Sequence, residues 1–116
     1  MEIPELVFDK EGKNLYHIYL FLIEDNKWWS FGHSAHYLSI MYPELEGIAA
    51  NCEGTDESIP CVCVPEHCLM NLSDCYDTLA SDAYIQVSAP PTVYCYRKEY
   101  GNWSEQLLPV NINSLY

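Results

Sequence analysis

The sequence predicts an α+β fold, in which a mostly antiparallel sheet of about five to six strands has two helices packed on one side. Short runs rich in β-branched and aromatic residues recur along the chain, separated by Gly, Pro, Asn and Asp, as in strands joined by hairpins. Two other segments repeat apolar residues at three- and four-residue spacing, as helices do. The 116 residues suit one domain covering 1–116, and an apolar fraction of 49% suffices for a core.

The predicted order of elements begins with three strands. Residues 6–9 are expected to form a short strand that ends at a turn containing Gly12. Residues 15–23 give the clearest strand, because β-branched and aromatic side chains dominate the segment. Both of its alternating faces are apolar, so it is either a central strand covered on both sides or one whose second face meets a partner. Residues 28–31 follow a short polar turn and are expected to pair with it as a hairpin.

A helix and an acidic connection are expected next. Ser34 is suited to cap a helix that runs to about Tyr42, and Pro43 stops this helix. From Pro43 to Pro60 the chain is expected to be an irregular acidic connection, with a helical turn near residues 48–50.

The second half of the chain is expected to open with a buried strand over residues 59–64. Pro65 is favourable as the first residue of a second helix, which is expected to reach about Ala80. The apolar side chains of this helix recur at helical spacing and define one face, made of Cys68, Leu69, Leu72, Cys75, Tyr76 and Leu79.

The last predicted feature of the sheet is a hairpin formed by residues 83–87 and 93–98. Its apolar face belongs to the core, and its other face carries Tyr84, Tyr94 and Tyr96. Tyrosine offers a large contact area with a polar tip and is enriched at protein interfaces, so these three are candidate partner-binding residues. The tail from Asn102 is expected to fold back on the body of the protein.

The distribution of charge is the most unusual feature of the sequence. There are 17 acidic and 5 basic residues, a formal net charge of −12, and no Lys or Arg between Lys27 and Arg97. The candidate partner-binding carboxylates of that stretch are Glu44, Glu46, Glu53, Asp56, Glu57, Glu66, Asp74, Asp77 and Asp82. Asp74 and Asp77 are expected to be neighbours at i and i+3 on the outer side of the second helix. So few cations argue against direct binding of nucleic acid, which requires Lys and Arg.

The cysteines are expected to be free core thiols rather than metal ligands. Six are present, and those nearest to a possible zinc motif, with one histidine, are Cys61, Cys63, His67 and Cys68. No C-x₂-C pair occurs, and thiols that alternate with valines in a strand or lie on an apolar helix face behave as small hydrophobic groups. We therefore expect no metal and no cofactor, with a redox or metal role for the cysteines as a weaker alternative. No catalytic motif is present, so we expect no catalytic residues and no enzyme.

These observations together predict a small acidic, non-enzymatic protein that binds and inhibits a basic, nucleic-acid-binding protein such as a nuclease. Immunity proteins, antitoxins and phage-type anti-CRISPR or anti-nuclease inhibitors act in this way, with carboxylates in the place of phosphates. The alternative is a structural or assembly subunit that forms a homo-oligomer through its tyrosine-rich sheet face. The start of the sequence has no secretory pattern and no apolar run is long enough to span a bilayer, so we expect a cytoplasmic protein, as monomer or dimer, without a membrane partner.

Overall fold

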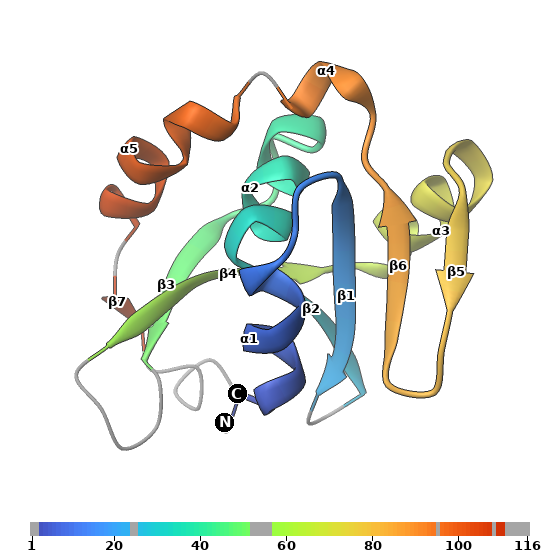
Figure 1. The fold of residues 1–116 in the computed structure, drawn as a ribbon, viewed down its shortest axis with the longest axis horizontal. Helices are drawn as coiled ribbons and strands as arrows, with labels where there is room; N and C mark the ends of the chain where they lie inside the picture. The colour runs from blue at the N-terminus through green and yellow to red at the C-terminus, as the bar shows by residue number, and fades with distance from the viewer. Residues whose placement is uncertain (1–2, 24–25, 52–56, 95, 108, 111–116) are drawn as a thin grey trace.

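A single mixed sheet runs through the middle of the molecule (Figure 1). The computed structural model describes residues 3–23, 26–51, 57–94, 96–107 and 109–110. In chain order the elements are α1 (Glu5–Gly12), β1 (His17–Ile23), β2 (Lys27–Phe31), α2 (Gly32–Met41), β3 (Gly47–Asn51), β4 (Ser58–Val64), α3 (Glu66–Cys75), β5 (Thr78–Ala80), β6 (Tyr84–Ser88), α4 (Pro91–Tyr94), the 3₁₀ turn η1 (Arg97–Glu99), α5 (Tyr100–Glu105) and β7 (Pro109–Val110).

The described strands follow the order β5-β6-β1-β2-β4-β3-β7, and the first six pair antiparallel. Only the short β7 joins in parallel, beside β3. β1 lies between its hairpin partner β2 and the much later β6. The predicted α+β class and antiparallel sheet are therefore confirmed. Among the described residues, no helix is both long and apolar enough to cross a membrane.

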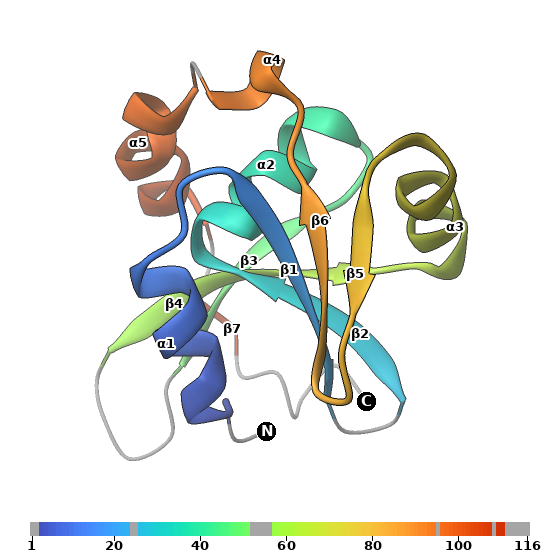
Figure 2. The ribbon, with the colours of Figure 1, turned by 45° about the vertical axis from the view of Figure 1, so that its right-hand side comes forward.

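The sheet has an apolar cluster on each face. On one face Leu20 of β1 and Val87 of β6 pack with Leu38 of α2 and Leu72 of α3. This arrangement confirms two helices on one side of the sheet. On the other face β1 and β2 pack against Val7 of α1, so the central strand is covered on both sides, the first of the two predicted alternatives (Figure 2).

The prediction of a strand over residues 6–9 is wrong, because these residues lie in α1. Ile3, Leu6 and Val7 are spaced by three and four residues and face the sheet together, which is the pattern of a helix face. Phe8 remains 44% exposed on the other side. A run of three apolar residues fits a strand or a helix equally, and packing on the sheet decides for the helix.

The expected helical turn near residues 48–50 is also wrong, since these residues lie in β3. Ala50 pairs with Ile59 of β4. Small residues suit this strand because α5 approaches it closely: a Cβ atom on Gly47 would lie 3.0 Å from the Trp103 ring. This contact confirms that the tail folds back on the body, while Leu107 also reaches Gly47.

The second helix is shorter than predicted, and the last hairpin has a different partner. α3 ends at Cys75, because Tyr76 adopts an extended backbone, and residues 78–80 form the edge strand β5. β6 confirms the strand predicted over residues 83–87, but it forms its hairpin with β5. The second strand of this hairpin, predicted over residues 93–98, is wrong, because the described residues of this range hold the end of α4 and part of η1. Pro91 begins α4, a position where a missing N–H costs nothing.

The first turn of α2 is capped from another helix, so the prediction of Ser34 as N-cap is wrong. The Glu11 carboxylate of α1 accepts hydrogen bonds from the Ser34 backbone N–H at 3.1 Å and the Ser34 hydroxyl at 2.5 Å. Asn14 Nδ2 donates to the same carboxylate and to the carbonyl oxygen of His17. α2 begins at Gly32, whose φ of +57° brings the backbone within reach of Glu11.

Candidate functional site

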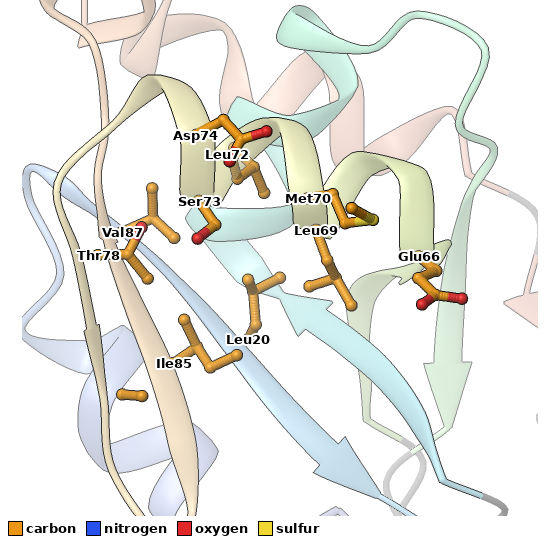
Figure 3. Close-up of a pocket in the computed structure, with 11 residues that line it drawn as sticks. Leu20, Glu66, Leu69, Met70, Leu72, Ser73, Asp74, Thr78, Ile85 and Val87 are labelled. Atoms are coloured by element: carbon orange, nitrogen blue, oxygen red, sulfur yellow. The ribbon is translucent and has the colours of Figure 1, made fainter.

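A groove of about 460 Å³ lies between α3 and the β5–β6 hairpin (Figure 3). Its floor is formed by the apolar side chains of Leu20, Leu72 and Val87, which are almost fully buried. Among the described residues, the lining is Leu20, Glu66, Leu69, Met70, Leu72, Ser73, Asp74, Thr78, Ala80, Ile85 and Val87. The groove is thus an apolar channel with polar groups at its edges.

One row of α3 side chains borders this groove with alternating chemistry. Glu66, Met70 and Asp74 follow one another at i, i+4 and i+8, so they lie on the same side of the helix, as Figure 3 shows. All three are exposed, and Met70 is 61% exposed. The row, which we call the Glu–Met–Asp row, therefore presents one apolar side chain with a carboxylate one turn to each side.

The two carboxylates of the Glu–Met–Asp row differ in their relation to the helix dipole. Glu66 is in the first turn of α3, where a negative charge is favourable. Asp74 is in the last turn, which contains no basic residue. A carboxylate there is expected to cost about 0.3–1 kcal/mol. Helix stability therefore does not explain why a carboxylate occupies position 74.

The other predicted carboxylates that the structure describes are exposed, and they are spread over several elements, with only Glu44 and Glu46 near the start of α3. Glu46 directly precedes β3, whose first residue pairs with Val62, so it lies at the end of β4 that leads into α3. Glu57 directly precedes the opposite end of β4, roughly 20 Å away at the rise of a strand. Glu44 follows α2, and Asp82 lies in the turn between β5 and β6.

Asp77 lies beyond the end of α3, so its predicted i, i+3 pairing with Asp74 on the helix is wrong. Glu53 and Asp56 fall outside the residues that the structure describes.

The tyrosines are not gathered beside the groove, because the hairpin predicted to align them does not form. Tyr84 is half-buried on the opposite face of the sheet, where the Lys10 ammonium lies 4.7 Å from its ring centroid. Tyr96 is 42% exposed between α4 and η1, and Tyr94 ends α4. The exposed apolar side chain beside the carboxylates Glu66 and Asp74 is Met70, which was not predicted from the sequence. It could have been found as an apolar residue on the polar side of the predicted helix.

The cysteines divide between core and surface. Cys61 and Cys68 are buried, as predicted, while Cys63 and Cys75 are exposed, so the prediction of core thiols is wrong for these two. Burial raises the pKa of the Cys61 thiol to about 12, which keeps it protonated at neutral pH. Cys52 and Cys95 lie outside the described residues. Cys68 also has possible metal ligands as neighbours, because donor atoms of Glu44, His67 and Cys68 lie within 4.8 Å of one another.

The groove has the chemistry to bind a group that carries a positive charge on an apolar stem. Its polar side chains among the lining residues are two carboxylates and the hydroxyls of Ser73 and Thr78. Comparison of the chain with protein-family models, curated proteins and solved structures finds no match. A function is therefore inferred from the groove and the charge alone.

Proposed function

We propose that this chain is a non-enzymatic cytoplasmic inhibitor that binds a basic, nucleic-acid-binding protein, such as a nuclease, through the α3 groove. The observation that carries the proposal is the Glu–Met–Asp row beside an apolar channel in a protein of net charge −12. Immunity proteins, antitoxins and phage-type anti-CRISPR or anti-nuclease proteins are the classes of inhibitor that this function would include.

The contact would use both kinds of side chain in the row. Lys and Arg carry a long apolar stem below a charged head. The stem of such a residue fits the channel over Leu20 and Val87, and its head then reaches Glu66 or Asp74. A carboxylate of this chain that accepts hydrogen bonds from a guanidinium of the partner would occupy the position that a nucleic-acid phosphate takes on that partner. Met70 adds an adaptable apolar contact.

The placement of the basic residues supports this orientation. Four of the five belong to α1, the residue after it, and η1, namely Lys10, Lys13, Arg97 and Lys98. The fifth, Lys27, lines a second pocket together with Glu66, so most but not all of the positive charge lies away from α3. Arg97 is hydrogen-bonded to the carbonyl oxygen of Asn14, which joins η1 to the end of α1. α1 packs on the face of the sheet opposite α3. The field of the molecule would therefore turn α3 toward a positively charged partner.

A pair of charge-reversal variants tests this proposal. Glu66→Lys with Asp74→Lys reverses the two carboxylates of the row. Glu5→Lys with Asp9→Lys is the matched control, because both residues are exposed, are also spaced by helical turns, and change the net charge equally. In each pair a favourable first-turn carboxylate and a later one are reversed, so the changes in helix stability of about 0.3–1 kcal/mol largely offset each other.

The measurement is a pull-down from the native host, followed by binding kinetics with the captured protein at several salt concentrations. We expect the native chain and the control pair to capture a basic protein, with association that slows as salt rises. The row variant should lose at least tenfold in association rate. An equal loss of association rate in both double variants would mean that only the net charge matters. Unchanged binding by the row variant would exclude the groove as the binding site.

A further inference from the structure

Three side chains with different donor atoms converge where the chain leaves α2 and enters α3. Glu44 lies in the turn after α2, and His67 and Cys68 lie in the first turn of α3. Their ligand atoms, a carboxylate oxygen, an imidazole nitrogen and a sulfur, all lie within 4.8 Å of one another. Glu44 and His67 are exposed, while Cys68 is fully buried and forms the inner wall of the cluster.

We propose that Glu44, His67 and Cys68 form a binding site for a divalent transition-metal ion, with Zn²⁺ as the ion that fits best. Zinc accepts oxygen, nitrogen and sulfur ligands at about 2.0–2.3 Å. Magnesium and calcium prefer oxygen ligands alone, so the thiol and imidazole select against them. The site lies beyond the groove and does not depend on the proposed inhibitory function.

The backbone around the cluster is already held in place. The Leu45 N–H donates to the Tyr42 carbonyl oxygen at 3.0 Å, which closes the turn that carries Glu44. The Cys68 N–H donates to the Pro65 carbonyl oxygen at 3.1 Å at the start of α3. The Tyr42 hydroxyl is hydrogen-bonded to Asn71, which ties the end of α2 to α3 one turn beyond the cluster. Rotation of the exposed Glu44 and His67 side chains would then bring their ligand atoms closer to the Cys68 sulfur.

Three protein ligands leave one position of a tetrahedral zinc ion open to solvent, where a water molecule would bind. Cys68 coordinates as the thiolate, and its proton passes to solvent when the ion binds.

Titration of the reduced, metal-free protein with Zn²⁺ and with Co²⁺ tests this site. We expect one ion per chain, a rise in melting temperature with added Zn²⁺, and a thiolate-to-cobalt charge-transfer absorption with Co²⁺. Glu44→Gln and His67→Gln should each weaken Zn²⁺ binding at least tenfold while the chain stays folded, because both side chains are exposed. Cys68→Ser should remove the charge-transfer absorption.

The matched controls are Glu46→Gln, Cys63→Ser and Cys75→Ser, which change exposed residues outside the cluster. These variants should bind Zn²⁺ as the native chain does and keep the absorption. Absence of one-to-one binding in the native chain, or binding that Glu44→Gln and His67→Gln leave unchanged, would overturn the site. Loss of the absorption in Cys63→Ser or Cys75→Ser would also overturn it. Should Cys68→Ser not fold, the two exposed ligands still decide the outcome.

Discussion

The Glu11 carboxylate joins three parts of the chain through one side chain. It receives hydrogen bonds from the backbone and hydroxyl of Ser34 and from Asn14, and the Ser34 hydroxyl also accepts from the Tyr19 N–H at 2.9 Å. Burial raises the pKa of Glu11, while these hydrogen bonds oppose that rise. The residue therefore fixes α1, β1 and α2 relative to one another.

Replacement of Glu11 by alanine is expected to lower the free energy of unfolding by about 1–3 kcal/mol, because donors of the buried Ser34 lose their acceptor. Urea unfolding followed by circular dichroism measures the change. Asp9→Ala, at an exposed position of the same helix, should stay within about 0.5 kcal/mol of the native chain. Equal midpoints for the two variants would contradict the role given to Glu11.

Glu11 also shows why the residue that caps α2 could not be predicted from the sequence. Ser34 has the residue type of an N-cap and stands before an apolar run, so a local pattern selects it. The actual cap comes from α1, and its contact with Ser34 exists only once both helices pack on β1. A pattern that compares near neighbours in the sequence does not include that acceptor.

At the scale of elements, α5 is held to α2 by aromatic rings. His33 stacks on Tyr100 with ring centroids 4.0 Å apart, and His36 lies 4.9 Å from Trp103. Burial, the nearby Arg97 guanidinium and His36 lower the pKa of His33 to about 4. A histidine whose pKa is lower in the folded state stabilises the fold above its unfolded value of about 6.5, and this contribution is lost as the pH falls toward 4.

The free energy of unfolding is therefore expected to decrease between pH 6.5 and pH 4. The variant His33→Phe keeps a ring against Tyr100 but cannot be protonated, so its decrease should be smaller over this interval. Urea unfolding at a series of pH values provides the comparison. An identical pH dependence in His33→Phe and the native chain would exclude His33 as its source.

Elements were predicted well where side-chain pattern and packing agree, and poorly where packing overrides the pattern. β1 has β-branched and aromatic residues on both faces, and the structure confirms the strand and the first of its two predicted alternatives, a central position covered on both sides. β3 consists of Gly47–Asn51, a sequence of low strand propensity, and becomes a strand because β4 pairs with it. β5 was assigned to the end of the helix, since Leu79 continued the helical spacing.

At the scale of the whole molecule, the covered sheet and the net charge both oppose self-association. Helices pack on both faces, and the described edge strands are short, with three residues in β5 and two in β7. Light scattering is expected to give the 13.4 kDa monomer at low and at high salt. A stable dimer insensitive to salt would instead favour the structural or assembly subunit described above as the alternative.

The acidic side of the molecule was partly predictable, whereas its shape was not. The charge gap in the sequence identified Glu66 and Asp74 as candidate residues. The groove floor combines Leu20, Leu72 and Val87 from β1, α3 and β6, which the fold alone brings together. The same holds for the approach of Glu44 to the start of α3.

The position of β1 between β2 and β6 has a consequence for synthesis on the ribosome. The β1–β2 hairpin can form early, but one edge of β1 stays open until Ser88 is made and pairs with His17. At about 5–20 residues per second, the interval between synthesis of Ile23, the end of β1, and synthesis of Ser88 lasts roughly 3–13 s. During that time the nascent chain exposes an apolar strand edge to other chains, and the groove has no floor from β6. The proposed binding groove would therefore be complete only after β6 has been synthesised and has paired with β1.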